Sequence, residues 1–177
     1  MFKEGELHMQ QYPVRTIDLE ALRENVRLLR STLPADAYGH GIAKVARAAL
    51  EAGASALAVA RTDEGAALRQ AGVTAPVLVL GASSDEEIAE GVRNELTLTV
   101  CTPEMVDTLE SCAKDSGLMG LMHLKIDTGM GRIGVRTEEE IRAILARLQV
   151  SPHVRLTGAF THFADADGSD MAYTRMQ

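Results

Sequence analysis

Apolar and polar residues follow one another along this chain in blocks of two kinds. Short, nearly continuous apolar runs alternate with longer stretches in which apolar positions recur every three or four residues. The first kind of block predicts buried strands, and the second predicts amphipathic helices. The expected strands lie at residues 56–60, 76–80, 96–100, 122–126 and 154–160, and the expected helices at 42–53, 62–71, 84–92, 102–114 and 137–148.

Strands that alternate with helices indicate βαβ units and therefore an α/β fold with a parallel sheet. Neither a glycine-rich linker nor a block of charge divides residues 13–177, so we expect one domain there, preceded by an N-terminal extension at residues 1–12. Five strands are too few to close a TIM-type (β/α)8 barrel. The pattern leaves two architectures open, a partial barrel with bare strand edges and a doubly wound open sheet.

The alternation breaks once, near the N-terminus. Residues 13–17 are expected to be extended, and Asp18 to cap a helix over residues 19–29. A Tyr-Gly-His-Gly turn within residues 35–41 then follows this helix with no apolar run between them. A turn of this kind that opens a helix looks like a ligand-binding loop, and such loops normally follow a buried strand, so the sequence predicts that a strand is missing in front of this turn.

Composition narrows the possible partners. The 177 residues carry a net charge of −7, with 3% aromatic residues and no basic stripe, so nucleic-acid binding is not expected. The first residues have no apolar core of a signal peptide, and no apolar span of membrane-crossing length follows. We therefore expect a cytoplasmic protein that does not enter a membrane.

The most informative candidate chemistry follows the strand at 122–126. Lys125 and Arg132 bring two cations to the carboxyl end of this strand, where α/β folds bind ligands, and the glycines between them allow a ligand to approach the backbone. The alternative is a structural role, with Lys125 in a salt bridge and Arg132 at a helix entry. The motif at residues 129–134 also matches G-x-G-x-x-G, but the next helix begins after the motif, which disfavours a dinucleotide site.

A histidine follows the last predicted strand. His162 is succeeded by Asp165 and Asp167, and His123 lies on the preceding strand. A metal-dependent barrel hydrolase could use His162, Asp165 and Asp167, which keeps this class as a rival hypothesis. The spacings typical of metal ligands are absent, so no metal site is expected.

Several segments together resemble one family, the alanine racemases, in their N-terminal barrel domain. The segments are ADAYGHG (residues 35–41), VARTDE (59–64) with Leu68 and Arg69, PVLVLG (76–81), KIDTGMGRIG (125–134), and THFA (161–164) with Asp167. They occur in the family's order, and the resemblance covers residues 13–177. It implies a TIM-type barrel and a pyridoxal 5'-phosphate-dependent isomerase that interconverts L-alanine and D-alanine for the cell wall. It also implies a homodimer.

The resemblance assigns roles to individual residues. It places Tyr38 on the phosphate side of the cofactor, Arg132 at the cofactor's phenolic oxygen and His162 next to the pyridine ring. Lys125 falls beside that arginine, at a position that is carbamylated in some members. In the family, a strand before the Tyr-Gly-His-Gly turn ends in the lysine that forms the Schiff base with the cofactor, and here that position is Pro34.

The departures from the family lead to a specific expectation. A proline has no amine to bind the cofactor covalently, and the family's second base and the rest of its phosphate loop correspond to positions beyond Gln177. We therefore expect an incomplete barrel domain with an internal deletion around Leu33 and Pro34, inactive on its own. A non-catalytic remnant that binds pyridoxal phosphate or another subunit is the alternative.

Overall fold

The computed structural model of the chain describes residue 37 and residues 39–177, which fall within the compact unit Ala35–Gln177. The extended segment at 13–17, the helix at 19–29, Pro34 and Tyr38 lie outside the described residues, so the expectations placed on them stay predictions. Among the described helices, none is long and apolar enough to cross a membrane.

Helices and strands alternate throughout the described part of the chain. The helices are α2 (Ile42–Glu51), α3 (Thr62–Gln70), α4 (Asp85–Arg93), α5 (Pro103–Ser116), α6 (Glu138–Leu148) and a short α7 (Ala172–Met176). The strands are β1 (Leu57–Val59), β2 (Val77–Val79), β3 (Thr97–Val100), β4 (Gly120–Lys125) and β5 (Val154–Phe160). All five strands pair in parallel in one sheet, in the order β1-β2-β3-β4-β5.

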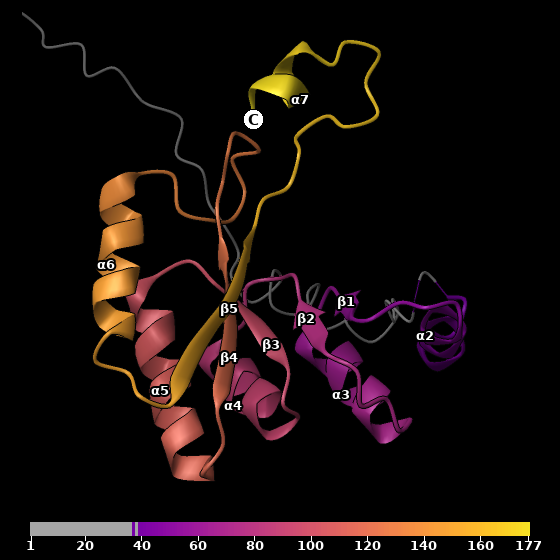
Figure 1. Cartoon of the computed structure of the whole chain (residues 1–177), viewed down its shortest axis with the longest axis vertical. Coiled ribbons are helices and arrows are strands. Elements are labelled where there is room, and N and C mark those ends of the chain that lie inside the picture. Colours follow the sequence, from indigo (N-terminus) through magenta and orange to yellow (C-terminus); the bar gives the residue numbers. More distant parts are fainter. Residues whose placement is uncertain (1–36, 38) are drawn as a thin grey trace, which may run out of the picture. The chain divides into compact units, whose positions relative to one another are not determined.

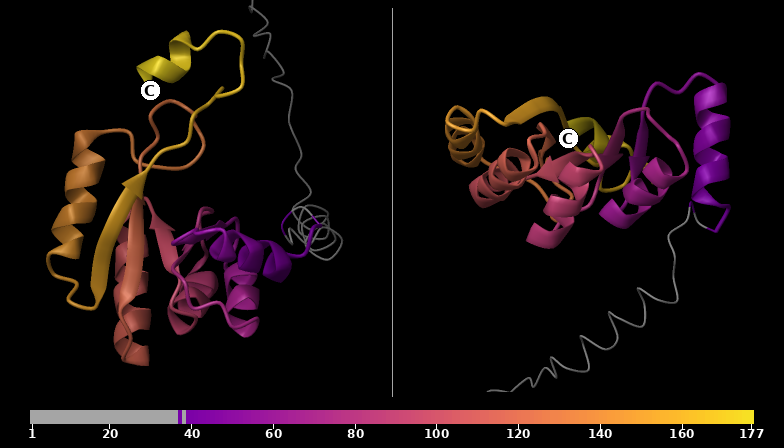
Figure 2. Two further views of the ribbon diagram at one scale, coloured as in Figure 1. Left: turned by 45° about the vertical axis from the view of Figure 1, so that its right-hand side comes forward. Right: turned by 90° about the horizontal axis from the view of Figure 1, so that it is seen from below.

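The strand order decides between the two architectures. Because crossovers between parallel strands are right-handed, strands laid down in sequential order place every crossover helix on the same face of the sheet. Helices α2 to α6 do form one row on one face, in which α2 contacts α3, α3 contacts α4, α4 contacts α5 and α5 contacts α6, while α7 lies beyond the end of the sheet (Figures 1 and 2). A doubly wound sheet would reverse its order and carry helices on both faces. The structure is therefore a sector of a barrel, as the first alternative predicted.

Local sequence signals set where the helices begin and end. The Ser84 hydroxyl accepts a hydrogen bond from the Glu87 backbone N–H, and the Glu87 carboxylate accepts one from the Ser84 N–H, which forms a capping box at the start of α4. Thr137 and Glu140 form the same box at the start of α6. At the other end of α5, Gly117 adopts a left-handed conformation, φ 66°, which stops the helix before β4.

The apolar core lies between the sheet and its layer of helices. Strand side chains that face the helices are almost completely buried against helix side chains; they include Val77, Val79, Leu98, Val100, Met122 and Leu124, packed with Leu68, Ile88, Val106, Leu109 and Ile144. Gly120 fixes this orientation for β4, since a Cβ there would lie 2.7 Å from Leu109 of α5. His123 and Lys125, on the alternate positions of β4, therefore face the barrel interior.

Strand β5 changes face part of the way along its length. Met122 pairs with Leu156 but His123 pairs with Gly158, so Thr157 is an extra residue, and its hydroxyl donates to the Met122 carbonyl. Such a β-bulge shifts every later side chain to the opposite face. As a result, Phe160 pairs with Lys125 and points into the barrel interior rather than toward the helices.

Arg69 has a structural role at the amino end of the sheet. Its guanidinium donates hydrogen bonds to four backbone carbonyls, those of Val73, Ala75, Asn94 and Glu95, at 2.8–3.2 Å. These carbonyls belong to the loops that lead into β2 and β3. Arg69 therefore joins two loops at the end of the sheet opposite to the ligand end of a barrel.

Two elements differ from the sequence-based expectation. Strand β4 begins at Gly120 rather than at residue 122, because Gly117 reverses the chain and the Gly120 N–H donates to the His153 carbonyl ahead of β5. The short helix α7 was not expected, since its five residues are too few to show a helical period. The other predicted elements within the described range are confirmed to within a few residues at their ends.

Candidate functional site

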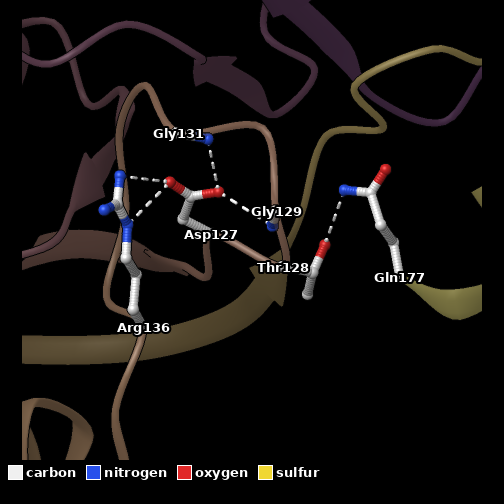
Figure 3. Close-up of a pocket in the computed structure, with 6 residues that line it drawn as sticks. All are labelled: Asp127, Thr128, Gly129, Gly131, Arg136 and Gln177. Atoms are coloured by element: carbon white, nitrogen blue, oxygen red, sulfur yellow. Dashed lines mark hydrogen bonds and ion pairs between the residues drawn. The ribbon is translucent and has the colours of Figure 1, made fainter. Parts of the chain in front are cut away.

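A single carboxylate organises the loop between β4 and α6, which begins directly after Lys125. One oxygen of Asp127 accepts hydrogen bonds from the backbone N–H groups of Gly129 and Gly131, both at 3.0 Å (Figure 3). Its other oxygen receives the Arg136 guanidinium, with Nε at 3.1 Å and a terminal nitrogen at 3.0 Å. These donors lower the pKa of Asp127 to about 2, so the side chain is anionic at neutral pH.

The far end of this loop closes against the strand from which it started. The Val135 N–H donates to the Lys125 carbonyl, and the Asp127 N–H donates to the Val135 carbonyl. Gly134 makes this closure possible, because it has a φ of 126° and a Cβ there would lie 2.7 Å from the Asp127 nitrogen. The glycine motif at residues 129–134 thus builds a closed loop, and α6 begins only at Glu138. The motif therefore lacks the helix N-terminus that holds the pyrophosphate in a dinucleotide-binding motif.

Lys125 is a buried cation at the carboxyl end of β4. Its residue is 5% exposed, its ammonium donates to the Ile126 carbonyl at 3.1 Å, and the nitrogen lies 5.2 Å from the centre of the Phe160 ring. Burial lowers the pKa of Lys125, an effect opposed by nearby Asp127 and reinforced by nearby Arg132. Because Asp127 is already occupied by Arg136, Lys125 has no ion-pair partner among the described residues.

Arg132 lies at the exposed tip of the same loop. It forms no hydrogen bond or ion pair with any residue that the structure describes, yet it is close enough to Lys125 to lower that group's pKa. The end of β4 and the loop after it therefore carry two cations, a buried Lys125 and an exposed Arg132, and neither is neutralised within the described chain. This arrangement suits an anionic ligand and argues against the structural alternative of a salt-bridged Lys125.

His162 is exposed and lies in the segment that follows β5. This segment is tied to the β4–α6 loop by side chains: Thr161 shares a hydrogen bond with Thr128 at 2.7 Å, and the Tyr173 hydroxyl donates to the Gly129 carbonyl at 2.9 Å. No hydrogen bond or ion pair joins His162 to Lys125 or Arg132 within the part of the chain described. Both segments nevertheless extend beyond the carboxyl end of the sheet (Figure 1).

An open pocket of about 540 Å³ lies between the β4–α6 loop and the end of α7. It is lined by Asp127, Thr128, Gly129, Gly131, Arg136 and Gln177 (Figure 3). Lys125, Arg132 and His162 do not line this pocket. Its polar groups are largely engaged with one another, as in the pairs Asp127–Arg136 and Thr128–Gln177. We interpret this pocket as a consequence of how the β4–α6 loop folds, and it is separate from the site around Lys125 and Arg132.

Three residues that border this end of the sheet were not singled out from the sequence. Asp127 could have been found, because an aspartate two residues before a glycine favours a local side-chain-to-backbone turn. Leu80, 41% exposed just after β2, offers an apolar surface at the same end of the sheet. Phe160 could not have been placed beside Lys125, since the bulge that turns it inward leaves no clear sequence signal.

Across the described residues, no group of three or more His, Cys, Asp or Glu side chains could hold a metal ion, which leaves the hydrolase hypothesis without structural support.

The fold and the site together define a barrel domain with two cations at the carboxyl end of β4. Residues 17–177 match the family model of the alanine racemase N-terminal domain, and the chain belongs to this family. It is 38% identical to an alanine racemase of Methanococcus maripaludis, over 180 aligned positions that include 96% of this chain and 48% of that protein. It is 46% identical to the alanine racemase of Geobacillus stearothermophilus, over 91% of this chain and 44% of that protein.

Solved structures give the same result. The alanine racemase of Clostridium difficile superposes with a TM-score of 0.76 at 37% identity, over 89% of this chain and 44% of that one. A histidine racemase from Leuconostoc mesenteroides superposes with a TM-score of 0.75 at 26% identity. The chain thus spans about half the length of the relatives it matches. The M. maripaludis alignment is longer than the 177 residues of this chain, so it contains gaps on this chain's side.

Proposed function

We propose that this chain forms the pyridoxal 5'-phosphate-binding barrel region of an alanine-racemase-type isomerase. The observation that carries the proposal is the pair of cations at the carboxyl end of β4, Lys125 on the strand and Arg132 on the Asp127-organised loop, which have no neutralising partner in the described residues. In the proposed site, Arg132 faces the cofactor's phenolic oxygen, Tyr38 its phosphate and His162 its pyridine ring. Alanine is the proposed substrate.

The chemistry of the available groups fits such a cofactor. Pyridoxal phosphate is an anionic aromatic molecule, and it needs cationic or N–H donors for its oxygens and an apolar surface for its ring. The planar guanidinium of Arg132 is a cationic hydrogen-bond donor suited to such oxygens, and Leu80 supplies an exposed apolar surface at the same end of the sheet. Gly131 has no side chain to obstruct approach to the loop, and a Cβ there would have no neighbour closer than 3.9 Å.

The chain's own residues would bind and orient the ligand. Arg132 would hold a negatively charged oxygen at its guanidinium, and Lys125, kept in place by the Ile126 carbonyl, would add a second positive charge next to it. His162 would contact the ring from the segment after β5. When bound, pyridoxal phosphate supplies an electron-withdrawing ring that stabilises the negative charge left after removal of an amino acid's α-proton.

Position 34 limits what the chain can do with the cofactor. Pro34 carries no amine, so we propose that the cofactor is held reversibly and that the chain on its own does not racemise alanine. The gaps on this chain's side of the alignment support a deletion relative to the family, without locating it. A non-catalytic remnant that binds the cofactor is consistent with the same features, as are a cytoplasmic location, a homodimer and a link to D-alanine supply for the cell wall.

Equilibrium dialysis of the purified chain against pyridoxal phosphate, followed by borohydride reduction and peptide mass spectrometry, tests this function. We expect saturable binding that dialysis reverses and no stoichiometric adduct on any lysine. A coupled assay for D-alanine should give no signal above a cofactor-only control. Absence of saturable binding would refute the cofactor site. Stoichiometric trapping on one lysine, or D-alanine formation, would refute the role given to Pro34.

The histidine racemase neighbour bears on the choice of substrate. Its fold agrees with that of this chain as well as the folds of the alanine racemases do, although its name records a different amino acid. The proposal of alanine therefore rests on the higher sequence identity to alanine racemases. Addition of alanine or histidine to the cofactor-loaded chain, with binding followed by cofactor fluorescence, would show which amino acid the site accepts.

A further inference from the structure

The loop between β5 and α7 contains a dipeptide that occurs once in this chain. Asp167 is followed by Gly168, and no other aspartate or asparagine of the sequence precedes a glycine. An Asp-Gly pair can react with itself, because the backbone nitrogen of the glycine can attack the side-chain carboxyl carbon of the aspartate. Glycine favours this attack, since it has no side chain to obstruct the approach. The folded structure decides whether the pair is free to react.

The backbone around this pair is not held in place. Residues 166–169 form a series of bends in the loop that leads to α7, and Asp167 is exposed (Figure 1). The structure gives the backbone groups of these four residues no hydrogen bond with any residue that it describes. The nearest anchors lie on either side, where the Thr174 hydroxyl donates to the Asp165 carbonyl at 2.7 Å and the Ala172 N–H donates to the Asp170 carboxylate at 2.9 Å. The Gly168 nitrogen can therefore turn toward the Asp167 carboxyl group.

Helix α5 contains a pair in the opposite situation. Asp115 is followed by the small residue Ser116, and both lie in the last turn of this helix. Helical backbone angles fix the position of the following nitrogen, and the N–H groups there are bound to carbonyls of the preceding turn. This pair can react in the same way only after the helix opens, which makes it an internal comparison for the loop.

We propose that Asp167 is a site of isoaspartate formation in the folded chain. The Gly168 nitrogen gives its proton to solvent and forms a bond to the Asp167 side-chain carboxyl carbon, from which one oxygen leaves as water. Water then opens the resulting cyclic imide at either carbonyl carbon. When the nitrogen separates from the side-chain carbon, aspartate is restored; when it stays on that carbon and the main-chain carbonyl is hydrolysed, isoaspartate forms. Water is the only reactant that the sequence of steps requires.

The product differs from aspartate in two respects. The main chain becomes longer by one methylene group, inside a loop that the hydrogen bond between Thr174 and Asp165 closes. Isoaspartate also carries a free α-carboxylate. This group defines the chemistry of a partner, an enzyme that transfers a methyl group from S-adenosylmethionine to the carboxylate of an isoaspartyl residue. The reaction does not depend on binding of a cofactor by the chain.

The test incubates the full chain at neutral pH and physiological temperature in water labelled with 18O. Each opening of the imide leaves one labelled oxygen, and digestion in unlabelled water adds none. Peptide mass spectrometry should find the label at Asp167 but not at Asp115, and the labelled protein should accept methyl groups from S-adenosylmethionine and a purified isoaspartate methyltransferase. In urea, both positions should gain label. A folded chain without label at Asp167, beside an unfolded chain that gains it, would show that the loop protects the pair and would overturn the proposal.

Three variants make the result specific. Asp167→Glu should abolish the label, because the corresponding imide ring is larger and forms much more slowly, while the same exchange at Asp170→Glu should leave it unchanged. Gly168→Ala should remove most of the label. This variant should still fold, since the φ of Gly168 lies outside the range that favours glycine and the nearby carboxylate belongs to the exposed Asp165, which can turn away. Label that persists in Asp167→Glu, or equal labelling of Asp115 and Asp167 in the folded chain, would contradict the assignment.

Discussion

The two segments that carry the candidate cofactor residues are held in different ways. The β4–α6 loop, which bears Arg132, is fixed from inside by the buried Asp127 carboxylate and by two backbone hydrogen bonds that close it onto β4. The segment after β5, which bears His162, is held by side-chain hydrogen bonds to the β4–α6 loop, such as the one between Thr161 and Thr128. Most of its residues between 162 and 176 are exposed.

This difference indicates which part of the candidate site has a fixed geometry before a ligand binds. The β4–α6 loop is fixed by its own hydrogen bonds, whereas the segment after β5 depends on contacts with its neighbours. A loop that satisfies its own backbone groups presents its cations in one geometry before any ligand arrives, which lowers the entropic cost of binding. A segment held by a few exposed contacts opens at a lower free energy. We therefore expect the binding of an anionic ligand to depend first on Arg132 and less on His162.

Among the variants that test this difference between the two segments, Gly134→Ala is expected to change the free energy of unfolding most. The new Cβ would lie 2.7 Å from the Asp127 nitrogen and 3.0 Å from the Lys125 carbonyl oxygen, at a residue with φ of 126°. Strain and overlap together should lower the free energy of unfolding by about 3 kcal/mol. The control is Gly72→Ala, where φ is also positive but no atom lies within 4 Å, and strain alone should cost about 1 kcal/mol. Urea denaturation would show the difference, and equal losses would contradict the tight closure.

Asp127→Asn tests the carboxylate at the centre of the loop. Its pKa is about 2 in the folded chain, below the ordinary value of 3.8. Its contribution to stability is therefore fully present above about pH 4 and is lost as the pH falls toward 2. The variant should be less stable than the wild type at pH 7, and the two should converge at low pH. Melting temperatures measured across this range would check the prediction, and a constant difference would argue against it.

A smaller effect is expected from Thr161→Val, on the segment after β5. The change removes the hydroxyl that pairs with Thr128 at 2.7 Å, and it should cost about 1 kcal/mol. Hydrogen exchange of the amides at residues 162–170 should accelerate, while exchange at Gly129 and Gly131 should stay slow. A double-mutant cycle with Thr128→Val isolates the pair. Acceleration in the β4–α6 loop instead would mean that the two segments open together.

The sequence predicted the alternation of elements well, because short apolar runs and helical periods are local features. The periodicity alone could not decide between a barrel sector and a doubly wound sheet, since strand order depends on the direction of each crossover in space, whereas the resemblance to the family correctly implied a partial barrel. The order β1-β2-β3-β4-β5 settles this point. The bulge at Thr157 also escaped prediction, because strand register is a property of two strands and not of β5 alone.

The candidate site could be predicted from the sequence less completely than the order of helices and strands. Lys125 and Arg132 were located correctly at the end of β4, because cations just after an apolar strand fall at the ligand end of an α/β fold. Their surroundings were not predictable: Asp127 organises the loop through contacts with Gly131 and Arg136, and Phe160 reaches Lys125 from another strand. The roles given to Tyr38 and Pro34 stay predictions, since both residues lie outside the described part of the chain.

The affinity for pyridoxal phosphate in three matched variants tests the central claim most directly. Arg132→Ala removes the cation at the loop tip, His162→Ala removes the ring from the segment after β5, and Arg142→Ala removes an exposed arginine that pairs with Glu138 on α6. A charge-assisted hydrogen bond contributes about 1.5–3 kcal/mol, so Arg132→Ala should raise the dissociation constant at least about tenfold. His162→Ala should raise it less, and Arg142→Ala should leave it unchanged. Wild-type affinity in Arg132→Ala, together with a large loss in His162→Ala, would contradict the account.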